Sequence, residues 1–135
     1  MTIEYDGTYF AGWQSQKNSQ TIQDSVESAL KKVLGSKIRI TGAGRTDKGV
    51  HALSQCANFK FENKIQNKKK FLDSMNFFLK KKQISIIDLK NKAKNFHSRY
   101  SAKLRTYEYL IVNRQGTLSI NKNRAWHVKK KIDLK

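Results

Sequence analysis

The chain has 135 residues, with 28 Lys and Arg against 10 Asp and Glu and a formal net charge of +18. This length predicts a single domain over residues 1–135 with a modest hydrophobic core. Hydrophobic residues make up 38% of the chain, which is too many for a disordered segment. No stretch has the roughly 18 apolar residues of a membrane span, and the first residues lack a signal-peptide pattern. We therefore expect a cytoplasmic protein with no membrane partner.

The excess of positive charge predicts a polyanionic partner, with nucleic acid as the leading candidate. Lys makes up most of the basic residues. In addition, Asn and Ile are frequent and Pro is absent. A coding bias toward AT-rich codons also produces such a profile. The charge therefore supports nucleic-acid binding without establishing it.

The first elements are a strand, a loop and a helix. Residues 2–6 predict a short strand, and residues 7–19 predict a loop with two glycines. Apolar side chains then recur at helical spacing between Thr21, a suitable N-cap, and Gly35, a suitable C-terminal stop. The clearest helix of the chain is therefore expected between these two residues.

Two strands are predicted on either side of a glycine-rich loop. Residues 37–41 alternate between polar and apolar side chains, and residues 50–61 form a longer strand pattern. In the longer strand, one face is expected to carry Leu53, Ala57, Phe59 and Phe61. Cys56, the single cysteine, lies in this apolar pattern and is expected to be a packed thiol.

The second half of the chain predicts a helix and two more strands. The helix is expected over 67–80, a strand over 84–89 and a longer strand over 102–113, which is rich in β-branched and aromatic residues. The order strand, helix, strand, strand, helix, strand is that of the split β-α-β or ferredoxin-like fold. RNA-recognition modules share this plan. We predict an α+β fold with an antiparallel sheet and two helices on one face.

The loop GAGRTDKGVHA at 42–52 places one carboxylate, Asp47, between Arg45 and Lys48. Two neighbouring cations favour the ionised carboxylate. The residues after Gly44 fit neither a dinucleotide fingerprint nor a Walker loop, and the His residues lie too far apart in sequence to suggest a metal site. Two interpretations stay open, namely a surface loop with a local ion pair and a reactive carboxylate in a basic site. Among the carboxylates of the chain, Asp47 is the best candidate for a reactive one.

Four segments in order resemble the tRNA pseudouridine synthase A family. GRTDKGVHA at 44–52 is similar to the motif that contains the catalytic aspartate of that family. YDGTYFAGWQSQ at 5–16 resembles the opening of the family, and TIQDSVESAL at 21–30 resembles its first helix. FHSRYSAKLRTYEYLI at 96–111 resembles a later stretch and the strand that follows it. Four matches in family order cover most of the chain.

The resemblance implies an enzyme that isomerises uridine to pseudouridine at positions 38, 39 and 40 of the tRNA anticodon stem-loop, as a homodimer and with no cofactor or metal. Asp47 matches the catalytic aspartate, as nucleophile or as base. Tyr107 matches the tyrosine that packs against the target base, and Arg45 matches the arginine that holds the flipped nucleotide. Arg99 matches a further basic position near the RNA path. For the matching residues Tyr5, Trp13, Gln14 and His51, structural roles are at least as well supported.

The chain also departs from the family. Family members have two similar halves with the active-site cleft between them, and a basic residue of the second half pairs with the catalytic aspartate. The resemblance here reaches only the end of the first half, and the proline that follows the second helix in the family is absent. The resemblance therefore implies an N-terminal catalytic half or fragment. The alternative is a non-catalytic RNA-binding fragment that lacks the second half of the site.

Overall fold

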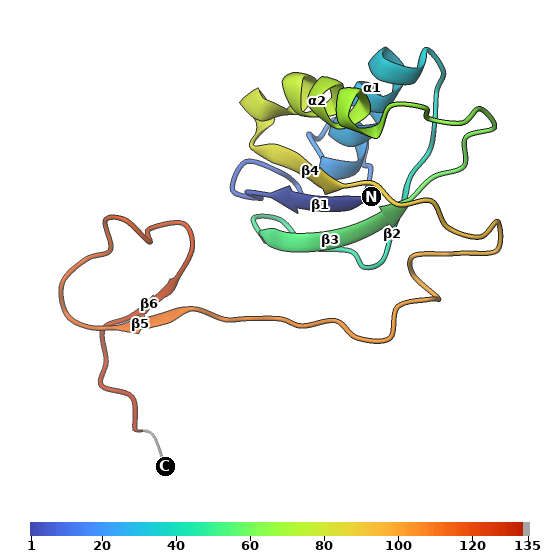
Figure 1. The fold of residues 1–135 in the computed structure, drawn as a ribbon. Helices are drawn as coiled ribbons and strands as arrows, with labels where there is room; N and C mark the ends of the chain where they lie inside the picture. Colours follow the sequence, from blue (N-terminus) through green and yellow to red (C-terminus); the bar gives the residue numbers. More distant parts are fainter. Residues whose placement is uncertain (134–135) are drawn as a thin grey trace. The chain divides into compact units, whose positions relative to one another are not determined.

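The structure, a computed structural model, describes residues 1–133 and divides the chain into two compact units (Figure 1). The first unit is Met1–Ala102, and the second begins at Lys103. Among the described residues, no helix has both the length and the apolar character needed to cross a membrane.

The first unit contains a four-stranded antiparallel sheet in the order β2-β3-β1-β4. Both helices lie together on one side of this sheet (Figure 1). The prediction of an α+β fold with an antiparallel sheet and two helices on one face is confirmed. The strands are β1 (Thr2–Tyr5), β2 (Thr41–Gly42), β3 (Ala52–Asn58) and β4 (Ile84–Asp88).

The first helix, α1 (Ile22–Leu34), begins and ends as its sequence predicts. The Thr21 side chain accepts a hydrogen bond from the backbone N–H of Asp24, which satisfies one of the free donors of the first turn. Gly35 ends the helix in the left-handed conformation, with φ of 73°. A residue without a Cβ adopts this conformation at little cost.

The second helix, α2 (Lys68–Leu79), is capped by the Asn67 side chain, which accepts from the N–H of Lys70. A short 3-10 turn, η1 (Lys80–Lys82), follows it and leads into β4. This agrees with the helix predicted over 67–80.

One hydrophobic core fills the space between the helices and the sheet. It includes apolar side chains of β1, α1, α2 and β4 and, from the opening loop, Phe10 and Trp13. The other buried members are Ile3, Tyr5, Ile22, Val26, Ala29, Leu30, Ile38, Ile40, Ala57, Phe71, Met75, Leu79, Ile84, Ile86 and Leu89.

The strand predicted over 37–41 is wrong for most of its length, because only Thr41 belongs to β2. The Glu27 carboxylate accepts from the backbone N–H of Ile40 at 3.0 Å, and the Gln23 amide donates to the Ile40 carbonyl at 3.4 Å. Side chains of α1 thus satisfy the backbone groups that a neighbouring strand would otherwise pair with.

The apolar face predicted for residues 50–61 is wrong at Leu53, whereas Phe59 and Phe61 pack against the core as predicted. Ala57 is fully buried, whereas 75% of Leu53 is exposed. The pairing of β1 with β3 shifts register between Ile3 and Tyr5. Because side chains alternate across a sheet, one shifted residue turns the following side chains to the other face.

The second unit contains β5 (Ile111–Asn113) and β6 (Trp126–Val128), which pair in parallel. The long strand predicted over 102–113 is therefore wrong before Ile111. Its β-branched and aromatic residues favour an extended backbone, but a strand also needs a partner for its hydrogen bonds. Among residues 103–133, only the three residues of β5 pair with β6.

Candidate active site

The glycine-rich loop of residues 43–51 connects β2 to β3 and is tied to β3 at its start. The N–H of Ala43 donates to the Cys56 carbonyl at 2.7 Å, and the Gln55 side chain donates to the Gly44 carbonyl at 2.9 Å. Further along, the N–H of Val50 donates to the Asp47 carbonyl at 3.2 Å and closes a turn. The backbone at Asp47 is therefore held in a turn of defined geometry.

The opening loop of the chain packs against this glycine-rich loop. The N–H of Trp13 donates to the Thr46 carbonyl at 2.9 Å, and the N–H of Gly49 donates to the Phe10 carbonyl at 3.3 Å. The Tyr5 hydroxyl and the Thr46 hydroxyl share a hydrogen bond of 2.8 Å. The two motifs that are far apart in sequence thus form one structural unit around Thr46.

Two glycines allow this close packing. A Cβ on Gly12, whose φ is 101°, would lie 2.6 Å from the Thr46 carbonyl oxygen. A Cβ on Gly42 would lie 2.7 Å from the Trp13 ring. Real Cβ atoms essentially never approach other heavy atoms so closely. Both positions therefore need glycine for steric reasons.

The side chains of Tyr5 and Trp13 are buried where the two loops pack together. Each is only 2% exposed, and their ring centroids lie 6.0 Å apart with a tilt of 37°. Such offset aromatic pairs add stability beyond the burial of their surface. Their place in the core agrees with a structural role.

His51, at the end of the glycine-rich loop, lies close to Asp6, which directly follows β1. The His51 Nδ1 atom lies 3.1 Å from the N–H nitrogen of Gly7 and 3.1 Å from Asp6 Oδ1. Neutral Nδ1 with a lone pair accepts from Gly7, whereas protonated Nδ1 donates to Asp6. In either state His51 links the end of the loop to the start of the opening segment.

Asp47 and Arg45 are both exposed on the loop, two residues apart. Among the described residues, no ion pair involves Asp47, so the local pairing with Arg45 or Lys48 that one interpretation expected is absent. The loop thus holds its backbone firmly and leaves the Asp47 carboxylate open to solvent. An ionised carboxylate in this setting can act as a nucleophile or as a base.

The other two predicted site residues lie on different segments. Arg99 is exposed and follows Ser98 in the first unit, and its guanidinium carbon lies 6.0 Å from the centre of the Tyr100 ring. Tyr107 belongs to the second unit, where 64% of it is exposed. Within the first unit, the loop brings Arg45 and Asp47 onto one short stretch of backbone.

Thr46 is the residue of this region that the sequence alone did not single out. Its carbonyl and its hydroxyl both bond to the opening segment, through Trp13 and Tyr5. The glycines of the two motifs are the sequence signal, because clustered glycines indicate a close approach of two backbones. That signal indicates a tight contact without naming the partner.

The fold and the loop define an α+β domain of the split β-α-β class that displays one exposed carboxylate on a glycine-rich turn. A family model described as tRNA pseudouridine synthase matches residues 1–101. That match covers well over half of the chain, and the chain belongs to the tRNA pseudouridine synthase family.

Individual relatives agree with the family assignment. The chain is 46% identical over 132 residues to the tRNA pseudouridine synthase A of Pelagibacter ubique, a match that covers 98% of this chain and 54% of that protein. It is 46% identical over 134 residues to the tRNA pseudouridine synthase A of Caldicellulosiruptor saccharolyticus, covering 99% of this chain and 54% of that protein. The protein of the same name from Maricaulis maris is 38% identical over 133 residues. The chain spans about half the length of these curated relatives.

Proposed function

We propose that this chain supplies the catalytic half of an enzyme that isomerises uridine to pseudouridine in tRNA, with Asp47 as the catalytic carboxylate. The observation that carries the proposal is the loop around Asp47, which is fixed by the Trp13–Thr46 and Phe10–Gly49 backbone bonds while Asp47 itself stays exposed. Membership of the tRNA pseudouridine synthase family supports the same reaction. A rigid loop with an accessible carboxylate is what a positioned nucleophile or base requires.

The reaction exchanges one bond for another. The bond between C1′ of the ribose and N1 of uracil breaks, and a bond between C1′ and C5 forms. C5 loses its proton and N1 gains one, so that the product has the same composition as the substrate. An ionised Asp47 can attack the sugar or remove a proton from it, and both roles need the unprotonated carboxylate.

Three further residues are proposed to contact the RNA substrate. Tyr107 offers an exposed aromatic ring on which a base extruded from the RNA stack can pack. Arg45 lies two residues from Asp47 and is exposed, so that it can contact the phosphate of the same nucleotide. Arg99 is a second exposed cation for the RNA path. The proposed substrate is the anticodon stem-loop, with its uridines at positions 38, 39 and 40.

The proposed complete enzyme has a second half, because the chain spans about half of its relatives. That half would add the basic partner of Asp47 and close the cleft. We further propose a homodimeric, cytoplasmic enzyme that needs no cofactor or metal.

The experiment compares two proteins on an unmodified tRNA transcript with uridine in the anticodon arm. One is this chain, and the other is this chain joined to the part of the Pelagibacter ubique relative that it does not cover. We expect the joined protein to form pseudouridine and its Asp47→Asn variant to lose about 10²- to 10⁴-fold or more of that activity. The variant should bind tRNA within threefold of the parent protein, because Asp47 is exposed and its replacement has the same shape.

An active Asp47→Asn protein would overturn the proposed role of this residue. A matched control is Asp73→Asn, which neutralises another exposed carboxylate on α2, away from the loop, and should leave the activity unchanged. Product formed by the 135-residue chain alone would contradict the need for a second half.

The second candidate function is a non-catalytic RNA-binding module, which the net charge of +18 favours. It predicts salt-dependent tRNA binding by both proteins and no pseudouridine from either. The same experiment therefore separates the two functions.

A further inference from the structure

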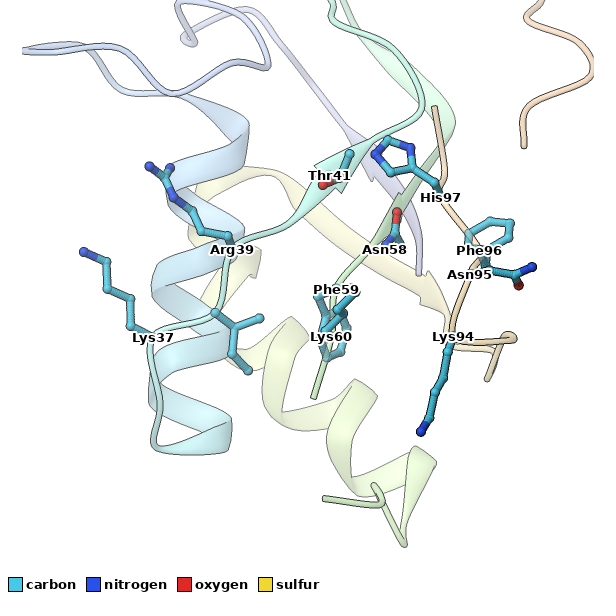
Figure 2. A pocket seen from close by; sticks show the side chains of 11 residues that line it. Lys37, Arg39, Thr41, Asn58, Phe59, Lys60, Lys94, Asn95, Phe96 and His97 are labelled. Atoms are coloured by element: carbon cyan, nitrogen blue, oxygen red, sulfur yellow. The ribbon is translucent and has the colours of Figure 1, made fainter. Parts of the chain in front are cut away.

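A pocket with a volume of about 520 Å³ lies beside the end of the β2–β3 pair that is remote from the glycine-rich loop (Figure 2). Thr41, Asn58 and Phe59 form its floor, where β2 begins and β3 ends. One wall is the segment 37–39 and the other is the segment 94–97, on the two sides of the view in Figure 2. Of the described residues, those of the glycine-rich loop do not line it.

The wall at 94–97 is fixed in place by the next residue, Ser98, which is only 2% exposed. The Ser98 hydroxyl donates to the Thr41 carbonyl at 2.6 Å, and its N–H donates to Asn58 Oδ1 at 2.9 Å. Two short hydrogen bonds from a buried residue hold this wall against the floor. The pocket is therefore built into the fold of the first unit.

The charge of the pocket has one sign. Four of its lining residues are cations, and none is acidic among the residues that the structure describes; the cations are Lys37, Arg39, Lys60 and Lys94. Arg39 also lies 3.7 Å from Glu27, but its side chain is 72% exposed, so this pair is weak and leaves the guanidinium open to a ligand. Four cations from three segments around one hollow favour a ligand with several negative charges.

Aromatic groups accompany these cations. Phe59 and Phe96 line the pocket and are half-buried. His97 also lines it and stacks on Tyr100 at 4.3 Å between ring centroids. The His97 Nδ1 atom is buried and has no hydrogen-bond partner among the described residues. Cations with aromatic rings between them are typical of surfaces that bind the backbone and bases of RNA.

The pocket is separate from the proposed active site. It lies at the Asn58 end of β3, whereas the glycine-rich loop enters this strand at Ala52. The strand has seven residues and spans roughly 20 Å. A ligand in the pocket therefore lies well away from a uridine at Asp47.

We propose that this pocket binds phosphates of the tRNA substrate at a second contact, away from the target uridine. Lys37, Lys60 and Lys94 neutralise the phosphates, and the aromatic walls contact the attached sugar or base. The contact would set the position of the RNA relative to the loop without taking part in the reaction. This inference rests on tRNA as the substrate of the proposed function.

The test replaces the three pocket lysines together, as Lys37→Gln, Lys60→Gln and Lys94→Gln. The matched control is Lys68→Gln, Lys69→Gln and Lys70→Gln, which removes the same charge from exposed positions in the first turn of α2. The Kd for an unmodified tRNA transcript is measured between 50 and 200 mM salt on the 135-residue chain. The association constant K falls as salt rises, and each lost phosphate contact makes the slope of log K against log salt shallower by about 0.7 to 0.9.

We expect the pocket variant to bind tRNA at least tenfold more weakly, with a salt slope shallower by about 2. The control should lose no more than threefold in affinity, with a salt slope shallower by less than about 1. Equal losses in both variants would overturn the proposal, because they would show that only total charge matters. Unchanged binding by the pocket variant would overturn it as well.

The same substitutions in the protein joined to the Pelagibacter ubique segment distinguish this inference from the proposed function. The pocket variant should raise KM for tRNA about tenfold and leave kcat within threefold, whereas Asp47→Asn should lower kcat. If the joined protein forms no pseudouridine, the proposed reaction fails and the binding measurement still decides on the pocket. A lower kcat with an unchanged KM in the pocket variant would overturn the positioning role.

Discussion

Trp13 donates its backbone N–H to the carbonyl of Thr46 at 2.9 Å. Thr46 is the residue directly before Asp47 in the sequence. The carbonyl of Trp13 in turn accepts from the N–H of Gln23 in the first turn of α1, at 3.0 Å. The Trp13 side chain itself is buried in the core. The loop that displays the candidate carboxylate is therefore coupled through one residue to the first turn of α1.

Gly12→Ala tests this coupling. A Cβ at this position would meet the Thr46 carbonyl at 2.6 Å, and the backbone φ of 101° is unfavourable for any residue with a Cβ. We expect a loss of about 2 kcal/mol or more in the free energy of unfolding, measured by urea denaturation. Pseudouridine formation by the joined protein should fall as well, because Thr46 and Asp47 have to move.

Gly35→Ala is the control for this substitution. Gly35 also has a positive φ, 73°, but a Cβ added there would meet no atom within 4 Å. We expect a smaller loss, about 1 kcal/mol, from the left-handed backbone alone. Equal losses for the two variants would contradict the view that the contact with Thr46 matters.

The ion pair between Asp88 and Lys90 gives a prediction on pH. The side-chain hydrogen bond from Lys90 is the main reason why the pKa of Asp88 lies below its ordinary value of 3.8. Because the folded-state pKa is the lower one, the stabilisation is present above the ordinary pKa and is lost as the pH falls through the folded-state pKa. Lys90→Gln should raise the pKa of Asp88 toward 3.8, as followed by an NMR titration of the carboxyl carbon. Lys92→Gln is the control, since Lys92 does not pair with this carboxylate among the described residues.

The elements with local signals could be predicted from the sequence. The ends of α1 follow from Thr21 and Gly35, whose cap geometry depends only on neighbouring residues. The position of the glycine-rich loop, which carries Asp47, follows from its composition. These features need no information on what lies across the fold.

The predictions that failed concern features that depend on partners far away in the sequence. Residues 37–40 alternate like a strand, but Gln23 and Glu27 of α1 bind the backbone at Ile40. The exposed side chain of Leu53 follows a register shift that is set by β1. The pocket could not be predicted either, because its cations come from three segments that only the fold brings together. The hydrophobic pattern and the secondary-structure propensity of a segment do not indicate such contacts.

Ser98→Ala tests whether the pocket wall depends on one buried side chain. The substitution removes the hydroxyl that donates to the Thr41 carbonyl at 2.6 Å and keeps the backbone bond to Asn58. We expect a loss of about 1 to 3 kcal/mol in the free energy of unfolding, because the Thr41 carbonyl loses the donor that faces it from the buried Ser98 side chain. Amide hydrogen exchange should become faster in residues 94–101, since this wall is held by few other bonds.

The control for this variant is Ser101→Ala in the same segment. The Ser101 hydroxyl is exposed and accepts from the N–H of His97 at 3.3 Å, a longer and solvent-accessible bond. Its loss should change the free energy of unfolding by less than about 1 kcal/mol. If the wall positions Lys94 for RNA, Ser98→Ala should also weaken tRNA binding, and Ser101→Ala should not. Equal exchange rates in the two variants would mean that the wall is held by contacts other than the Ser98 hydroxyl.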